Sequence, residues 1–189
     1  MKFGTKALHA GIKPDPSTGA IMTPIFQTST YVQDEPGVHK GYEYARTQNP
    51  TRDTLEKNLA SLENAGYGRC FSSGMSATET VIKTLNPGDE VISTSDLYGG
   101  TYRLFTKVFS KYGIKFTFVD MQDVSNITTA ITDKTKLIWA ETPTNPMMNI
   151  VDIKAITDIG KQNDVKVVVD NTFASPYLQN PLDMGADIV

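Results

Sequence analysis

The chain has 189 residues, with 18 basic and 21 acidic side chains and a formal net charge of −3 at pH 7. Hydrophobic residues make up 39% and charged residues 21%, a globular composition that excludes disordered, collagen-like and coiled-coil chains. The acidic balance argues against a nucleic-acid partner, no apolar run is long enough for a membrane span or a signal peptide, and one cysteine with two histidines excludes an internal disulfide and argues against a metal site.

Residues 1–50 show no sustained hydrophobic period and carry turn signals at Pro14-Asp15-Pro16 and Glu35-Pro36-Gly37. A loop region of this length is unusual inside a compact domain. The alternative, a disordered tail, fits poorly because the segment is rich in apolar side chains, namely Ile25, Phe26, Tyr31, Val32, Tyr42 and Tyr44. We therefore predict an extended N-terminal arm over residues 1–50 that packs on another surface, such as a neighbouring subunit.

From Thr51 onward, short apolar strands alternate with amphipathic helices. A first helix has Leu55, Leu59 and Leu62 on one face and ends before Gly66. The expected strands are 69–71, 90–93, 115–119, 136–140 and 165–169, and the helices that follow them are 75–85, 102–112, 124–131 and 153–162. This alternation predicts an α/β fold with a mostly parallel sheet covered on both faces. Residues 185–189 resemble the opening of another strand, so we expect the chain to be the front part of a longer, truncated protein.

Ligands bind at the carboxyl ends of the strands in an open parallel sheet, so the segments that follow the strands are candidate sites. Ser72-Ser73-Gly74-Met75 opens a helix whose free N–H groups suit a phosphate, although an ordinary N-cap by Ser72 or Ser73 explains the segment equally well. Asp96-Leu97-Tyr98-Gly99-Gly100-Thr101 offers a flat ring to a planar ligand, or forms a turn in which Tyr98 covers the core.

Further along the chain, two X–Pro bonds are expected to hold Glu141-Thr142-Pro143-Thr144-Asn145-Pro146 extended. Asp170 ends a run of three valines and needs a partner, which is either a positive ring nitrogen or, in the alternative, a helix N-terminus or an ion pair. In the arm, Tyr44 and Arg46 offer phosphate donors, unless Arg46 is a plain surface residue. Together the segments are suited to a planar, phosphorylated, cationic heteroaromatic ligand. Pyridoxal phosphate has these properties.

The chain resembles the pyridoxal-phosphate-dependent enzymes of cysteine and methionine metabolism in five segments that cover essentially its whole length. These segments are Tyr42–Arg46 with Asn49-Pro50-Thr51, Ser72–Met75, Asp96–Thr101, Glu141–Pro146 and Val169–Phe173. The resemblance implies a fold-type-I transferase large domain, of which residues 51–189 are the front part and the C-terminal domain is absent. It also implies that the arm, residues 1–50, contributes to a neighbouring subunit.

The resemblance implies two catalytic residues: Asp170, which would hold the protonated pyridine nitrogen, and Tyr98, which would stack on the ring and assist proton transfer. The residues that it implies for cofactor binding are Tyr44, Arg46, Ser73, Gly74, Met75, Tyr98, Asn145, Asp170 and Thr172. Tyr44 and Arg46 would reach the phosphate of a neighbouring subunit, and Asn145 would hydrogen-bond the ring hydroxyl. Glu141 is a further candidate near the cofactor, and no metal ligand is implied.

By resemblance, the reaction is γ-replacement or γ-elimination on a sulfur amino acid or an activated homoserine, as in cystathionine γ-synthases and γ-lyases. The implied assembly is a cytoplasmic homotetramer, a dimer of dimers. Methionine γ-lyase or O-acylhomoserine sulfhydrylase chemistry is the alternative, although Gly100 stands where methionine γ-lyases tend to carry a cysteine. The family's Schiff-base lysine is expected just after Val189, so a chain that truly ended there would be an inactive binding or interaction module.

Overall fold

The computed structural model describes residues 1–189, which divide into two compact units, Met1–Cys70 and Phe71–Val189. The division falls twenty residues beyond the predicted end of the arm, so the helix that starts at Pro50 belongs to the first unit. The assignment of residues 1–50 to a neighbouring subunit stays a prediction. None of the helices is both long and apolar enough to cross a membrane.

The first unit contains more regular structure than the predicted extended arm. Its elements are α1 (Phe3–His9), the antiparallel pair β1 (Gln33–Glu35) and β2 (Val38–His39), and α2 (Pro50–Leu62). The predicted turn at Glu35-Pro36-Gly37 joins β1 to β2, and Gly37 has a φ of +80°, a conformation that glycine adopts without strain. Helix α1 was not predicted, because it buries no residue that would give it a hydrophobic period.

Contacts with α2 hold the end of α1. The side-chain amide of Asn58 donates to the carbonyl oxygens of Lys6, at 3.0 Å, and Ala10, at 2.9 Å. The bond to Ala10 satisfies a carbonyl group that the helix end leaves without a partner, whereas the Lys6 carbonyl also accepts the Ala10 N–H at 2.9 Å. Gly11 follows with a φ of +78°, and a Cβ atom there would lie 2.7 Å from Cβ of Lys57. A glycine is therefore required for this close approach of α1 to α2.

Helix α2 starts at the predicted place but does not bury the predicted face. The Asn49 side chain caps it by accepting the Thr51 N–H at 2.9 Å. Leu55 and Leu59 remain 50% and 40% exposed, and the one buried residue of the helix is Ala60. The leucine side chains of α2 therefore form a surface that remains exposed in this chain.

The second unit is built on a four-stranded parallel sheet with the order β4-β3-β5-β6. Its strands are β3 (Glu90–Thr94), β4 (Lys115–Val119), β5 (Thr135–Glu141) and β6 (Lys166–Asp170), which confirms four of the predicted strands. The fifth, at 69–71, is wrong: residues there have no neighbouring strand, and the Cys70 N–H donates to a side chain, that of Glu56. Ile188 forms a single parallel bridge to Val168, next to β6.

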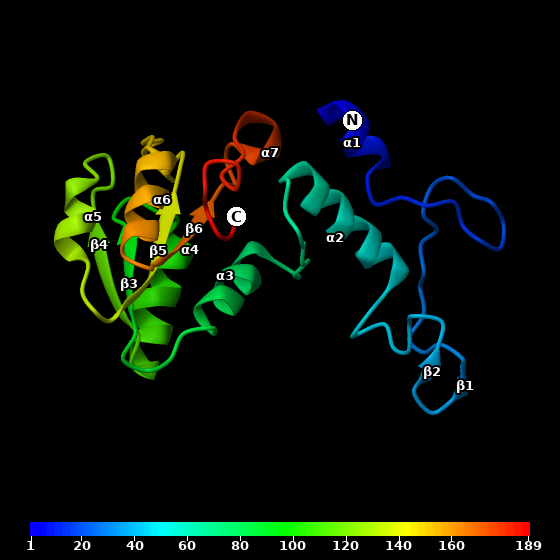
Figure 1. Ribbon diagram of the computed structural model, residues 1–189. Helices are drawn as coiled ribbons and strands as arrows, with labels where there is room; N and C mark the ends of the chain where they lie inside the picture. Colours follow the sequence, from blue (N-terminus) through cyan, green and yellow to red (C-terminus); the bar gives the residue numbers. More distant parts are fainter. The chain divides into compact units, whose positions relative to one another are not determined.

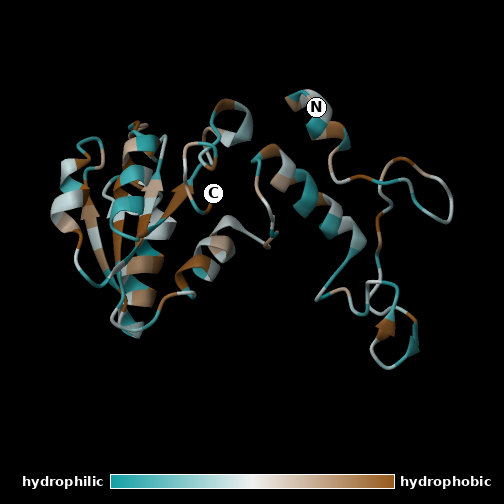
Figure 2. Ribbon diagram, in the orientation of Figure 1, coloured by the Kyte–Doolittle hydropathy of each residue, from teal (hydrophilic) through white to brown (hydrophobic).

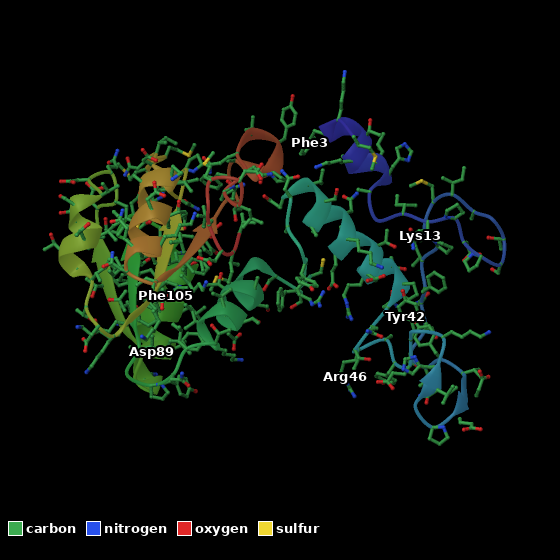
Figure 3. All side chains as sticks on the ribbon, in the orientation of Figure 1. Phe3, Lys13, Tyr42, Arg46, Asp89 and Phe105 are labelled. Carbon is green, nitrogen blue, oxygen red and sulfur yellow. The ribbon has the colours of Figure 1, made fainter.

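Helices cover both faces of this sheet (Figure 1). They are α3 (Gly74–Ile82), α4 (Gly99–Arg103), α5 (Ser125–Ala130) and α6 (Ile153–Gln162), whereas α7 (Ser175–Leu178), which follows β6, buries no residue. The helix predicted at 102–112 is not uniform, because α4 continues through a π-helical turn, Leu104–Val108, and a 3-10 turn, Phe109–Tyr112. Phe105, labelled in Figure 3, is buried there, stacked on the Phe116 ring with a centroid distance of 4.5 Å.

The core consists of two clusters separated by the sheet. Leu137 and Trp139 of β5 pack in the cluster that contains the α3 and α4 side, whereas Ile138 and Ala140 pack in the cluster with α5 and α6. Strands β3, β5 and β6 are largely buried, whereas the edge strand β4 is partly exposed. The hydrophobic residues of the strands are brown in Figure 2. Two helical layers thus hold the sheet rigid and leave its strand ends free for loops.

Candidate active site

The predicted site segments of the second unit lie at one edge of the sheet. Strand β5 pairs with β3 on one side and with β6 on the other, and all three run parallel. In this register Glu141, the last residue of β5, is the partner of Asp170, the last residue of β6. The loops that follow β3, β5 and β6 therefore leave the sheet side by side, as expected from the sequence.

Glu141 is at the centre of this edge. The residue is only 4% exposed, and its carboxylate accepts backbone N–H groups from two loops. The Tyr98 N–H donates to Oε2 at 2.9 Å and to Oε1 at 3.2 Å, and the Asn145 N–H donates to Oε1 at 2.8 Å. One side chain thus fixes Tyr98, at the end of the loop after β3, and Asn145, in the loop after β5.

The protonation of Glu141 is altered by its surroundings. Burial raises the pKa of its carboxyl group from the ordinary value of 4.5 to about 7. The hydrogen bonds from the Tyr98 and Asn145 N–H groups oppose this change, and the negative charges of Asp170 and Asp96 add to it. The carboxyl group therefore changes its charge near neutral pH.

The loop after β5 folds back on itself, so the predicted extended conformation of residues 141–146 is wrong. Its two X–Pro peptide bonds are cis, and the Thr144 N–H donates to the Asn149 carbonyl at 3.0 Å. Asp96, from the loop after β3, accepts the Thr144 hydroxyl, the Met147 N–H at 3.2 Å and the Asn149 side-chain amide at 3.3 Å. The sequence did not assign a role to Asp96, although it follows a buried strand at this same edge.

Tyr98 presents its ring to solvent rather than to the core. The residue is 44% exposed, which is inconsistent with the alternative in which it covers the core. A Cβ atom at Gly100 would lie 2.3 Å from Cε1 of Tyr98 and 3.0 Å from Sδ of Met75. The ring therefore lies against the glycine, close to the first turn of α3.

The start of α3 has both of the properties that the sequence offered as alternatives, a capping side chain and free N–H groups. Ser73 is the N-cap, since its hydroxyl oxygen accepts the Ser76 N–H at 3.1 Å. The N–H groups of Gly74 and Met75, the first two helical residues, have no acceptor within the chain. The cap and the anion-binding geometry therefore coexist, because capping uses a donor further along the helix.

Asp170 has an orienting partner but no cation. The N–H and hydroxyl groups of Thr172 donate to its Oδ1 at 3.1 Å and 2.5 Å. Asp170 takes part in none of the salt bridges of the chain, and the N-cap of the following helix is Ala174. Neither structural alternative, an ion pair or a helix cap, is formed, so the carboxylate is available to a positively charged ligand.

Tyr44 and Arg46 belong to the first unit. The Arg46 guanidinium carbon lies 4.9 Å from the centroid of the Tyr44 ring, and both side chains are exposed. Figure 3 shows Arg46 on the loop that precedes α2. The two residues are therefore close to each other and accessible, as binding to a neighbouring subunit requires.

The loops after β5 and β6 are joined by a residue that the sequence did not single out. The Gln179 side-chain amide donates to the Thr142 carbonyl at 2.9 Å and to Oδ1 of Asn171 at 2.7 Å. The Asn171 amide donates in return to the Gln179 carbonyl at 3.0 Å. No sequence signal could have found Gln179, because its partners come from two different loops.

The donor set of the second unit fits pyridoxal phosphate. Free N–H groups at a helix start suit the phosphate, an exposed tyrosine ring suits the planar face, and the unpaired Asp170 carboxylate suits a protonated ring nitrogen. The structure contains no cluster of side chains that could hold a metal ion.

Comparison with known proteins agrees with this chemistry. A family model described as Cys/Met metabolism PLP-dependent enzyme matches residues 4–189. The chain is 52% identical to a cystathionine gamma-synthase of Mycobacterium leprae and 51% identical to a cystathionine beta-lyase of Coxiella burnetii, covering 99% and 98% of this chain and 49% and 48% of those proteins.

A solved structure, cystathionine gamma-lyase from Lactobacillus plantarum complexed with L-serine, is 46% identical with a TM-score of 0.96, covering 100% of this chain and 49% of the other. The chain spans about half the length of the relatives that it matches.

Proposed function

The chain belongs to the family of Cys/Met metabolism PLP-dependent enzymes, and from this membership we propose that the whole protein catalyses γ-replacement or γ-elimination on a sulfur amino acid or an activated homoserine. The observation that carries the proposal is the Asp170 carboxylate, oriented by Thr172 and left without a cation at the carboxyl edge of the sheet. The names of the relatives, cystathionine gamma-synthase and gamma-lyase among them, support this substrate class.

Each residue at this edge has a distinct part in the proposal. The N–H groups of Gly74 and Met75 bind the cofactor phosphate, and Asp170 keeps a proton on the ring nitrogen, with its orientation fixed by Thr172. When bound, pyridoxal phosphate withdraws electrons from the α-carbon of the amino-acid substrate. Tyr98 covers one face of the ring, excludes water from it and holds a proton at its phenolic oxygen.

We also propose that the protein is a homo-oligomer, a dimer of dimers, in which Tyr44 and Arg46 bind the phosphate of a neighbouring subunit. A guanidinium group provides paired donors for a phosphate, which supports the assignment of Arg46. The first unit also exposes large apolar side chains that a neighbouring subunit would cover, namely Ile25, Val32, Leu55, Leu59 and Tyr67.

The test is the substitution Asp170→Ala in the full-length protein. We expect turnover to fall by about 100-fold or more, because the ring nitrogen loses the group that keeps it protonated. Asp158→Asn is the matched control, since Asp158 is an exposed carboxylate paired with Lys154 on α6. Turnover of Asp170→Ala near that of the control would overturn the proposal.

The products identify the reaction within the class. Cleavage of cystathionine on the γ side releases cysteine, ammonia and a four-carbon oxoacid, whereas cleavage on the β side releases homocysteine, ammonia and pyruvate. A γ-synthase forms cystathionine from an activated homoserine and cysteine. We expect γ-side products. Release of pyruvate without the four-carbon oxoacid would assign the protein to β-elimination instead.

A further inference from the structure

We propose that Glu141 is a positioning residue for the cofactor: its buried carboxyl group fixes the two loops that carry Tyr98 and Asn145. The inference rests on the proposed function, since these loops are the ones assigned to the cofactor ring. It concerns a residue that does not itself need to contact the cofactor or the substrate.

Glu141 lies between the two loops and is bonded to both. Its carboxylate is the acceptor for the Tyr98 N–H, at the end of the loop after β3, and for the Asn145 N–H in the loop after β5. Asp96 makes the reciprocal connection, because it lies in the loop after β3 and accepts the Thr144 hydroxyl from the loop after β5. Each loop thus supplies an acceptor for the other, which removes their independent motion.

The side chain of Glu141 suits this position because it can accept two hydrogen bonds at once. When Glu141 is ionised, above its pKa of about 7, its two carboxylate oxygen atoms only accept, and here both receive N–H groups. A glutamine of the same shape has one oxygen and one NH2 group, so in either orientation an NH2 donor faces a backbone N–H donor. Burial makes the loss of an acceptor costly, because water cannot replace it.

The backbone also connects Glu141 to Asp170. Glu141 and Asp170 are register partners at the ends of β5 and β6, and the N–H of the next residue, Thr142, donates to the Asp170 carbonyl at 3.3 Å. The backbone that carries Glu141 is therefore bonded to the backbone that carries Asp170. Glu141 thereby holds Tyr98 and Asn145 at fixed positions relative to Asp170.

The experiment compares Glu141→Gln with Glu90→Gln in the full-length protein. Glu90 is the matched control, because it is a largely buried carboxylate at the amino end of β3 that accepts the Lys115 ammonium at 2.9 Å and the Thr132 hydroxyl at 2.7 Å. Titration of each apoprotein with pyridoxal phosphate gives the dissociation constant, and circular dichroism in the cofactor's absorption band reports the fixed orientation of the ring.

We expect Glu141→Gln to raise the dissociation constant about tenfold, the loss that corresponds to one hydrogen bond to a charged group, and to weaken the circular-dichroism signal. Glu90→Gln should change neither, although both variants should unfold at lower temperature. If Glu141→Gln lowers only the unfolding temperature, as the control does, its role is structural and the proposal is overturned.

A measurement on the unsubstituted apoprotein keeps the proposal testable if Glu141→Gln does not fold. Hydrogen exchange resolved to single residues should be much slower at the Tyr98 and Asn145 N–H groups than at the Gly99 N–H, which has no acceptor. Equal exchange at the three positions would overturn the positioning role. Failure of the unsubstituted protein to bind pyridoxal phosphate would instead refute the proposed function, so the two failures are distinguishable.

Discussion

At the scale of single residues, the charge of Glu141 contributes to the pH dependence of the stability of the fold. Its pKa is raised from 4.5 to about 7 by burial, and the charges that face it are the carboxylates of Asp170 and Asp96. A carboxyl group with a higher pKa in the folded protein stabilises the fold fully below the unfolded pKa and loses that contribution as pH rises through the folded pKa. The window is therefore between pH 4.5 and about pH 7.

We expect the unfolding free energy of the unsubstituted protein to fall across this window relative to that of Glu141→Gln, which has no titrating group there. Urea denaturation at several pH values measures the difference. Glu90→Gln is a control of opposite sign, because hydrogen bonding to Lys115 holds the Glu90 pKa below its ordinary value. The stabilising contribution of Glu90 is lost only as pH falls. If the unfolding free energies of Glu141→Gln and Glu90→Gln, each taken relative to that of the unsubstituted protein, changed with pH in the same way, the role assigned to the burial of Glu141 would be contradicted.

At the scale of the element, α3 combines a structural cap with the N–H groups that we propose bind the cofactor phosphate. Ser73→Ala removes the acceptor of the Ser76 N–H, so we expect the unfolding free energy to fall by about 1 kcal/mol. We also expect weaker binding of inorganic phosphate, because a frayed first turn no longer fixes the Gly74 and Met75 N–H groups. Thr80→Ala on the same helix is the control, since the Thr80 hydroxyl donates only to the Ser76 carbonyl. Equal stability of the two variants in urea would show that the cap does not hold α3.

The same scale shows which elements a sequence can predict. Strand β4 and helix α6 begin and end at the predicted residues, because each has a clear hydrophobic period and α6 a capping residue, Asp152. The strand at 69–71 was predicted wrongly because a strand also needs a neighbour, which local pattern does not reveal. The π-helical turn in 102–112 was missed because its apolar spacing matches that of an ordinary helix.

The candidate site was predictable to a similar degree and for a similar reason. Tyr98 and Asp170 follow strands, so the parallel-sheet rule placed them at one edge before any contact was known. The bridges made by Asp96 and Gln179 depend on how three loops fold against one another. The sequence pattern identifies which side chains lie at the carboxyl edge of the sheet. Only the folded loops show which of these side chains hold the others in place.

At the scale of the whole molecule, we predict that Arg46 serves the active site of a neighbouring subunit. Arg46 and Asp170 belong to different units of the chain, and Arg46 is exposed beside the Tyr44 ring. If Arg46 binds the phosphate of a neighbouring subunit, each site of a dimer combines Asp170 from one subunit with Arg46 from the other. Two inactive variants can then complement each other, because a hybrid dimer of Arg46→Ala and Asp170→Ala contains one site with both native residues.

We expect each variant alone to have little activity and an equal mixture, unfolded and refolded together, to recover about a quarter of the unsubstituted activity. Random pairing makes half of the dimers hybrid, and each hybrid has one complete site of two. The control is the same mixture without refolding, in which subunits do not exchange and activity stays low. If Arg46 instead binds within its own subunit, every hybrid site carries one substitution and refolding restores nothing. Recovery therefore separates a shared site from a self-contained one, independently of how strongly either substitution weakens cofactor binding.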